Sequence, residues 1–465
     1  MNTGKYNAKH SVALLLSAAL SIFCSMAQAE HGGRDQTERD DHQSESRSGS
    51  DRDHSRDSDH GSSHADESHD NSNDGDKNSG KEGKDKDSKK EPGDHKNDNG
   101  SGRQIDTSLA NSKEERFVTE LDFEGHERRT GEVIMIGRDS HVEAVRSAGY
   151  KIISTQTLGS LDESITRIRV SAGESVEQAM QRLHTIDPDA EIASNHLFHP
   201  SQQATSNRNE AAIPAARNTN SIVSSHFVIG VIDTGADQTR ELLKLAIVDT
   251  QGLTENGYVP RTHGTIVSQI ACTEGARLAV ADVFGVDSEN RLVAPAEAIA
   301  RGIDWLLSKH VMLINVSIEG PDNMVLSHVI HRAIEKGAVI VAAAGNSGPA
   351  APPSYPAAYP GVIAVTAVDE NNVVYPRANR GEYITFAARG VRIPFNDGST
   401  QGTVSGTSFA APVIAAEIVR RMAESSGDAS AAIESLKRDA LDLGQPGRDN
   451  VFGWGMITLR PSAPR

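Results

Sequence analysis

The sequence is poor in cysteine, in aromatic residues and, over one long stretch, in apolar side chains. Only two cysteines occur among 465 residues, and the aromatic fraction is 4%. Cys24 lies in an N-terminal segment that we expect to be removed, so Cys272 has no partner for an intramolecular disulfide. Cys272 follows an apolar run that begins after His263. A reactive Cys/His pair is one interpretation, but the run favours a small buried core residue.

Large apolar side chains are nearly absent from residues 31–105. A segment that cannot bury apolar surface cannot offset the entropy of ordering its backbone, so we predict a disordered tether over residues 30–112. Its histidines could capture Zn²⁺ or Ni²⁺ weakly, but no ligand spacing of a closed metal site is present, which favours a solvated tether. These histidines are His31, His42, His54, His60, His64, His69 and His95.

The chain also lacks an ordered basic face and a long apolar run. Its net charge of −17 argues against a nucleic-acid partner. The apolar residues 12–23 are too few for a membrane span. Lys5 and Lys9 precede them and Ala27-Gln28-Ala29 follows, which is the arrangement of a cleavable signal peptide over residues 1–29. An uncleaved anchor is the alternative. We expect a secreted or periplasmic protein that has no membrane attachment after cleavage.

A small domain is predicted within residues 113–215, together with a linker. Its pattern alternates between strand and helix periodicity in the order β-α-β-β-α-β, the plan of a ferredoxin-like α+β domain. Residues 201–220 are rich in Ser, Asn and Ala, which indicates a linker and a natural place for proteolytic cleavage. The predicted strands are residues 131–137, 150–158, 164–170 and 190–198, and the predicted helices are residues 141–148 and 176–186.

The pattern changes in residues 216–465 to near-continuous apolar strands that alternate with helices. Continuous apolar strands are typical of a parallel sheet covered on both faces, so we predict a doubly wound α/β domain. The predicted strands are residues 227–232, 278–284, 311–316, 339–344 and 361–368, and the predicted helices are residues 295–309, 324–336 and 408–423.

Four short motifs follow the predicted strands or open the helices of this domain. Asp233 ends the first strand in Asp-Thr-Gly, and His263 lies in Thr-His-Gly-Thr. Asn346 lies in Ala-Ala-Gly-Asn, and Ser408 in Gly-Thr-Ser-Phe-Ala-Ala-Pro at a predicted helix N-terminus. Open α/β sheets bind substrates at the carboxyl ends of their strands. Acyl transfer needs a nucleophile, a base, a carboxylate that orients the base, and donors for the oxyanion, and these four residues supply them.

These motifs, in the order Asp…His…Ser, resemble the signatures of the subtilisin-like serine protease family. The resemblance covers about residues 225–457 and implies a peptide hydrolase that acts through an acyl-enzyme intermediate. It implies that Ser408 is the nucleophile, that His263 is the general base and then acid, and that Asp233 orients His263. Asn346 and the backbone N–H of Ser408 would form the oxyanion hole.

The resemblance also implies a substrate groove. Ser317-Ile-Glu-Gly320 matches the segment that pairs with substrate backbone as an added strand. Ala343, Ala344, Gly345 and Ser354 would line the pocket for the residue before the cleaved bond, whose composition favours medium or large apolar residues. Glu319 departs from the family pattern, in which a glycine is usual. It either favours basic substrate residues or points to solvent, and both interpretations stay open.

The small domain resembles the propeptides of the same family in its predicted plan. The implication is a self-processing zymogen in which this domain assists folding and inhibits the enzyme, with the tail near residues 196–200 in the active-site cleft. An unrelated ferredoxin-like domain is the alternative. We expect a monomer with protein or peptide substrates, no cofactor and no metal site. Calcium for stability stays open, because the family's usual calcium loop is not found after Asp233.

Three competing functions make different demands on the sequence. An α/β-hydrolase needs a histidine after its nucleophile, and none occurs after His331. A nucleotide-binding protein needs a Gly-rich phosphate loop after the first strand, which Asp233-Thr-Gly-Ala does not supply. A catalytically inactive binding protein of subtilisin fold is the remaining alternative. Such a protein is expected to lose one of the four motif residues, and all four are present here.

Overall fold

The computed structural model describes residues 116–459 except residues 138, 202, 206–226 and 397–400. The predicted signal peptide and tether, and most of the predicted linker, lie outside the described residues. The domain boundaries placed there therefore stay predictions. Within the described ranges, no helix is long and apolar enough to cross a membrane.

The small domain has the predicted β-α-β-β-α-β plan. Its antiparallel sheet runs in the order β5-β2-β4-β3, with β1 paired to β2. Regular structure begins before the first predicted strand, residues 131–137, because β1 pairs with the first half of the long strand β2. The elements are β1 Thr119–Leu121, β2 Glu127–Gly137, α1 Asp139–Ser147, β3 Lys151–Leu158, β4 Glu163–Arg169, α2 Val176–Ile186 and β5 Glu191–Pro200.

The second half of strand β2 is apolar, and both of its faces are covered. Val133 and Met135 pack with residues of α1 and α2, whereas Ile134 and Ile136 belong to a core shared with the larger domain. Helix α2 begins with a capping box in which Ser175 and Gln178 satisfy each other's backbone N–H groups. The small domain therefore has one core of its own and contributes to a second.

The larger domain is built on a parallel sheet, as its apolar strands predicted. The strand order is β19-β16-β15-β14-β12-β7-β9-β8. Its strands in chain order are β7 Val228–Asp233, β8 Ile247–Gly252, β9 Arg277–Asp282, β12 Leu313–Val316, β14 Val339–Ala343, β15 Ile363–Val368, β16 Ile384–Arg389 and β19 Met456–Ile457. Shorter strands outside this sheet are β6 Gln203–Thr205, β10 Gly285–Val286, β11 Leu292–Pro295, β13 Ile318–Glu319, β17 Ile393–Asn396 and β18 Gln401–Ser405.

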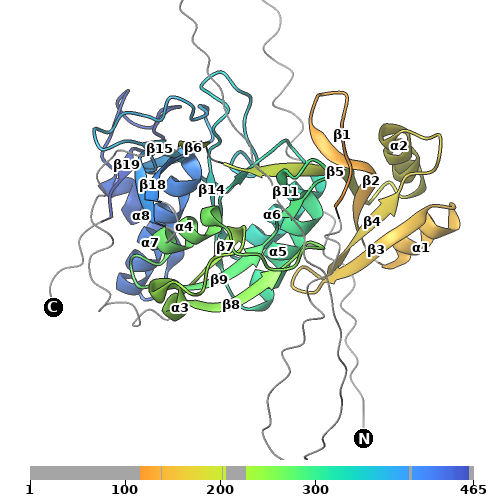
Figure 1. Ribbon diagram of the computed structural model, residues 1–465, viewed down its shortest axis with the longest axis horizontal. Coiled ribbons are helices and arrows are strands. Elements are labelled where there is room, and N and C mark those ends of the chain that lie inside the picture. The colour runs from red at the N-terminus through yellow and green to blue at the C-terminus, as the bar shows by residue number, and fades with distance from the viewer. Residues whose placement is uncertain (1–115, 138, 202, 206–226, 397–400, 460–465) are drawn as a thin grey trace, which may run out of the picture. The chain divides into compact units, whose positions relative to one another are not determined.

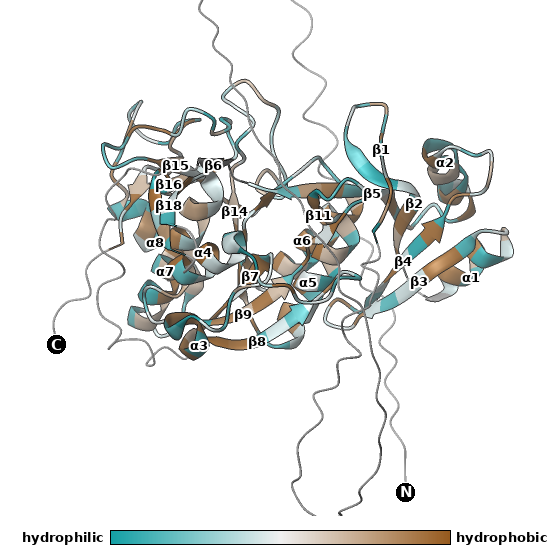
Figure 2. Cartoon of the chain, viewed as in Figure 1, coloured by the Kyte–Doolittle hydropathy of each residue, from teal (hydrophilic) through white to brown (hydrophobic). Residues whose placement is uncertain are grey.

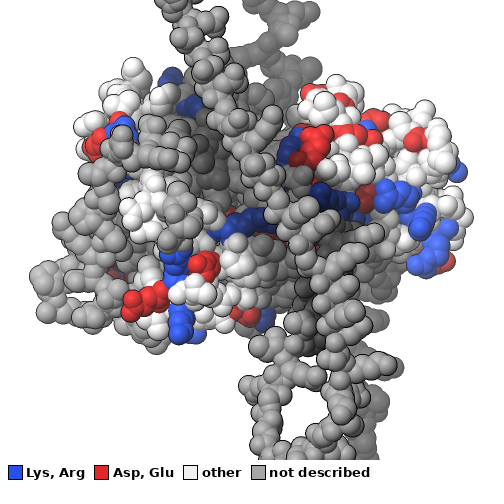
Figure 3. Space-filling model, in the orientation of Figure 1, with Lys and Arg blue, Asp and Glu red and all other residues white. Residues whose placement is uncertain are grey.

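Helices cover both faces of this sheet. The core on one face includes α5 and α6, and the core on the other includes α4, α7 and α8 (Figure 1). Strands β7 and β9 are brown in Figure 2, since both of their faces are apolar, whereas β1 is largely teal. Charges of both signs occur over the described surface in Figure 3. The helices are α3 Glu241–Ala246, α4 Thr262–Ala271, α5 Ala296–Ser308, α6 Met324–Glu335, α7 Thr407–Glu424 and α8 Ala429–Asp439.

Candidate active site

Asp233, His263 and Ser408 come from three elements that meet at the carboxyl edge of the parallel sheet. Asp233 is the last residue of β7, His263 lies in the first turn of α4, and Ser408 lies in the first turn of α7. Gly264 lets α4 approach β7, because a Cβ there would lie 2.1 Å from the carbonyl oxygen of Thr234. All three side chains are buried.

The three side chains lie in series, with each neighbouring pair within hydrogen-bonding distance. His263 Nδ1 lies 2.7 Å from Asp233 Oδ1, and His263 Nε2 lies 3.1 Å from Ser408 Oγ. A carboxylate can only accept, so Nδ1 carries the proton and Nε2 is left as an acceptor facing the Ser408 hydroxyl. The sequence-predicted nucleophile, base and orienting carboxylate are therefore brought within hydrogen-bond reach of one another.

At the start of α7, a side-chain hydrogen bond takes the place of a missing helical one. Pro412 lies inside α7 and has no N–H to donate to the carbonyl group of Ser408, four residues before it. The Ser317 hydroxyl donates to that carbonyl oxygen at 3.0 Å, and Asn315 Nδ2 donates to Ser317 Oγ at 2.8 Å. The Ser317 side chain thus supports the nucleophile's helix.

Asn346 lies just after β14 and faces the start of α7. Its Oδ1 accepts the backbone N–H of Thr407 at 3.1 Å, which fixes the orientation of the amide. Thr407 Oγ1 also accepts the backbone N–H of Gly345 at 3.1 Å. Asn346 Nδ2 is therefore directed towards the space beside Ser408, as expected for an oxyanion donor.

The end of the small domain runs through this site as an added strand. Within β5, Leu197 and Phe198 pair with β11, and His199 and Pro200 pair antiparallel with β13. After residue 202, β6 pairs antiparallel with β18, just before α7. The tail is therefore hydrogen-bonded to the larger domain both before and after the point where it passes Ser408. This agrees with the expected position of the tail.

Ser201 lies directly against the candidate nucleophile. Ser408 Oγ donates to the carbonyl oxygen of Ser201 at 2.5 Å, and the Ser201 N–H points to the carbonyl oxygen of Ser317 at 3.5 Å. The Ser201 hydroxyl accepts from Asn346 Nδ2 at 2.8 Å. The peptide bond nearest to Ser408 is therefore the one that follows Ser201, a residue that the sequence analysis had assigned only to the linker.

The side chain of Glu319 points into the site and not to solvent. Glu319 Oε2 accepts the backbone N–H of Asn346 at 2.6 Å and the Ser201 hydroxyl at 3.2 Å. Burial raises the pKa of Glu319, although these two hydrogen bonds and the charge of Arg377 act in the opposite direction. The solvent-facing interpretation of Glu319 is thus wrong.

The other residues predicted for the groove lie around Asn346 and β13. A Cβ at Gly320 would lie 2.3 Å from a ring carbon of the buried Phe198, so only glycine leaves room for this ring. Gly345 has a φ of 102° and packs against Ser354, where a Cβ would lie 2.8 Å from Ser354 Cβ. Ala343 and Ala344 are buried behind Asn346, and Ala344 accepts a hydrogen bond from Tyr383.

Cys272 belongs to the core and not to the site. It is fully buried in the cluster beneath α4, and its Sγ donates to the carbonyl oxygen of Gln269. Burial raises the pKa of the Cys272 thiol to about 12, so the thiolate is not formed at neutral pH. The buried-core interpretation of Cys272 is confirmed, and a Cys/His nucleophile is excluded.

Ion pairs join the small domain to the larger one. Arg129 makes two hydrogen bonds to Glu255, at 2.9 and 2.8 Å, and Arg167 lies 3.2 Å from the same carboxylate. Burial alone would raise the pKa of Glu255, but the hydrogen bonds and charges of Arg129, together with Arg167, lower it to about 2. This contact is therefore strongest when Glu255 is ionised.

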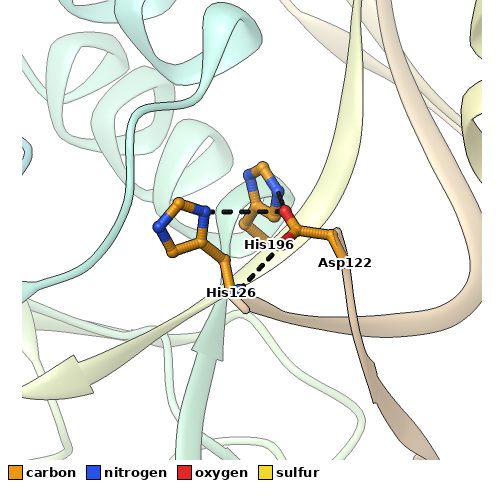
Figure 4. Close-up of side chains that lie close together, drawn as sticks. All are labelled: Asp122, His126 and His196. Carbon is orange, nitrogen blue, oxygen red and sulfur yellow. Dashed lines mark hydrogen bonds and ion pairs between the residues drawn. The ribbon is translucent and has the colours of Figure 1, made fainter. Parts of the chain in front are cut away.

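Among the described residues, one group has three donor atoms close enough to hold a metal ion. The donor atoms of Asp122, His126 and His196 all lie within 4.8 Å of one another (Figure 4). However, Asn323 Nδ2 donates to His196 Nδ1 while Asn323 Oδ1 caps α6, so His196 Nε2 carries the proton and donates to Asp122. That proton occupies the metal-facing nitrogen, and the group is satisfied as a hydrogen-bonded cluster.

Comparisons with known proteins agree with this geometry. A sequence profile described as the subtilase family matches residues 224–455. The chain belongs to the subtilase family. This subtilase is thereby placed among the subtilisin-like serine endopeptidases, which are peptide hydrolases.

Individual relatives extend the similarity beyond the larger domain. Subtilisin amylosacchariticus from Bacillus subtilis subsp. amylosacchariticus is 26% identical over 350 residues, which cover 71% of this chain and 90% of that protein. This share exceeds the stretch from residue 224 to the C-terminus, so the similarity reaches into the small domain. The minor extracellular protease Epr from Bacillus subtilis (strain 168) is 28% identical over 255 residues, which cover 52% of this chain and only 39% of that protein.

A solved structure shows the same fold. The crystal structure of fervidolysin from Fervidobacterium pennivorans, described as a keratinolytic enzyme related to subtilisin, matches with a TM-score of 0.59 and 19% sequence identity. The match covers 74% of this chain and 62% of the fervidolysin chain. At this identity the comparison supports the fold alone.

Proposed function

We propose that this subtilase is a secreted serine endopeptidase that acts through an Asp233–His263–Ser408 triad and is made as a self-processing zymogen. The observation that carries the proposal is the series of close contacts from Asp233 Oδ1 to His263 Nδ1, at 2.7 Å, and from His263 Nε2 to Ser408 Oγ, at 3.1 Å. Its order and spacing fit the transfer of a proton away from the attacking hydroxyl.

The catalytic steps follow from the hydrogen-bonding capacity of each group. Ser408 Oγ attacks the scissile carbonyl carbon while its proton moves to His263 Nε2, and Asp233 stabilises the imidazolium that forms. His263 then gives this proton to the leaving amine, which leaves an acyl-enzyme on Ser408. Water, deprotonated by His263, attacks the ester, and the acid product leaves with Ser408 restored.

The oxyanion is stabilised from two directions. The backbone N–H of Ser408 lies in the first turn of α7, where it has no intrahelical partner and the helix dipole favours negative charge. Asn346 Nδ2 supplies the second donor, once it exchanges the Ser201 hydroxyl for the developing oxyanion. Both donors are fixed before reaction, so they need little reorganisation during it.

Self-processing is proposed to occur at the bond between Ser201 and Gln202. The carbonyl group of Ser201 is within hydrogen-bond distance of Ser408 Oγ, and the chain pairs with β13 before this bond and with β18 after it. In this arrangement Ser408 donates its proton to that carbonyl oxygen, so attack requires the hydroxyl to turn towards His263. The docked small domain would thus block other substrates until its tail is cut and released.

Secretion and the substrate class are supported by other observations. The signal-like residues 1–29 precede the tether, and one relative is described as an extracellular protease. An unmodified protein or peptide chain is the proposed substrate, because the tail binds through backbone pairing. We propose that the processed enzyme is a monomer and uses no cofactor.

The experiment that tests this function uses a fluorophosphonate label and casein hydrolysis. The wild-type chain should be labelled at Ser408 and should degrade casein, because fluorophosphonates react with activated serines. Ser408→Ala should lose both properties, whereas Ser308→Ala, an exposed serine at the end of α5, should retain both. A folded wild-type chain that does neither would support the inactive binding protein instead.

A further inference from the structure

Glu319 contacts the residue that precedes the proposed cut. It lies in β13, which pairs with the tail, and its Oε2 is 3.2 Å from Ser201 Oγ. The same Oε2 accepts the backbone N–H of Asn346 at 2.6 Å, which holds the carboxylate in place. The side chain of the residue before the proposed cut therefore faces a hydrogen-bond acceptor whose position is fixed.

The Ser201 hydroxyl uses its full hydrogen-bonding capacity in this position. A hydroxyl has one proton to donate and two lone pairs. Glu319 Oε2 acts as an acceptor, since it also takes the backbone N–H of Asn346, so the Ser201 proton is directed to it. One lone pair accepts from Asn346 Nδ2 at 2.8 Å, and the other faces Thr407 Oγ1 at 3.0 Å, whose single proton is shared between Ser201 Oγ and Asn346 Oδ1. Ser201 is fully buried, so water does not replace any of these bonds.

We infer that Glu319 determines specificity by selecting a small hydroxyl-bearing residue, serine above all, immediately before the cleaved bond. This inference rests on the proposed protease function. An apolar pocket is expected from Ala343, Ala344 and Gly345. Glu319 makes this pocket polar, because it stands where the family usually has glycine.

The physical reason is the loss of one of the two hydrogen bonds that Glu319 Oε2 accepts in this site. An alanine at the position of Ser201 has nearly the same shape but no proton to donate, so Glu319 Oε2 would face a methyl group in a buried site. A hydrogen bond to a charged group contributes about ten-fold or more to binding. A site built around a substrate hydroxyl discriminates strongly against the analogue that lacks it.

The contact to Glu319 persists during attack. Asn346 Nδ2 moves from the hydroxyl to the developing oxyanion, whereas Glu319 Oε2 is not needed by the reaction and keeps the Ser201 proton. The selection by Glu319 therefore acts on kcat/KM and not only on ground-state binding.

The test uses the wild-type full-length chain after self-processing and quenched fluorescent peptides. Each peptide has the sequence of residues 197–204. The position of Ser201 carries Ser, Ala, Leu or Lys. The expected kcat/KM for the serine peptide exceeds that for the alanine peptide by about ten-fold or more. A ratio near one, or a higher kcat/KM for the leucine or lysine peptide, would overturn the inference.

Variants separate selection from general damage to the site. Glu319→Ala should bring the serine-to-alanine ratio close to one, and Glu319→Gln, which keeps a neutral acceptor, should give an intermediate ratio. Glu434→Ala, an exposed surface substitution on α8, should leave the ratio unchanged. An unchanged ratio in Glu319→Ala contradicts the inference. If no peptide is cleaved and no fluorophosphonate is bound by the wild type, the protease function itself fails.

Discussion

At the scale of single residues, one side chain near the site supplies a hydrogen bond that another residue cannot make. Pro412 removes one helical hydrogen bond, and the Ser317 hydroxyl replaces it on the Ser408 carbonyl. Ser317 was predicted from the resemblance as part of the substrate groove, and its carbonyl oxygen does face the Ser201 N–H. Its side chain has a separate role, which only the three-dimensional arrangement reveals.

This role predicts a reciprocal effect of two substitutions. In a Ser408→Ala background, which prevents self-digestion, Ser317→Ala should lower the free energy of unfolding by about 1–3 kcal/mol, because the carbonyl group of residue 408 loses its donor. Adding Pro412→Ala restores an N–H at position 412 and should recover most of this loss. Denaturant unfolding measures both, and strictly additive effects would contradict the proposed bond.

Asn346 gives the second prediction at this scale. Asn346→Ala should reduce kcat by about 10²–10³ with little change in KM, because the lost donor acts on the oxyanion and not on the substrate. Asn371→Ala, in an exposed turn, is the matched control and should behave as wild type. Steady-state kinetics on one peptide measures kcat and KM for both variants. An equal loss of kcat in the two variants would refute the assignment of Asn346 as an oxyanion donor.

The residue types and order of the four motifs were enough to predict which side chains meet. Asp233, His263, Asn346 and Ser408 each follow a strand or open a helix, and the parallel sheet brings those ends together. The orientation of Glu319 and the position of Ser201 were not predictable, because they depend on contacts between segments more than a hundred residues apart.

At the scale of elements, the long apolar strands and amphipathic helices were predicted well. Among the elements that were not predicted are strands β1, β8, β16 and β19 and helices α3, α4 and α8. The local pattern is weak in β1, where Leu121 is exposed, and in α8, where only Ala432 and Leu436 are fully buried. Strand β5 was predicted, but its extension onto β11 and β13 depends on backbone pairing that carries no sequence signature.

Phe198 provides the apolar anchor of this extension. It is fully buried against Gly320, so Phe198→Ala should lower the free energy of unfolding of the full-length Ser408→Ala chain by about 3–5 kcal/mol. Phe123→Ala, whose side chain is exposed in the same domain, should change it by less than about 0.5 kcal/mol. Similar values for the two variants would show that Phe198 does not anchor the tail.

For the molecule as a whole, the contact between the two domains should depend on pH through Glu255. The pKa of Glu255 is lowered to about 2 in the docked state from its ordinary 4.5. Its contribution is therefore fully present above about pH 4.5 and is lost as the pH falls towards about 2. In the Ser408→Ala chain, the stability difference from Glu255→Gln should shrink over this window. A difference that stays constant below pH 4.5 would contradict the ion pair.

The most direct test of the account is the intact mass of the chain expressed from residue 30, followed over hours beside Ser408→Ala. The wild type should convert to two fragments, of which the larger begins at Gln202, and Ser408→Ala should remain whole. A first cut elsewhere in the linker would leave the triad standing but refute the bond assigned to self-processing. Equal cleavage of both chains, or of neither, would contradict the claim that Ser408 cuts the tail that lies across it.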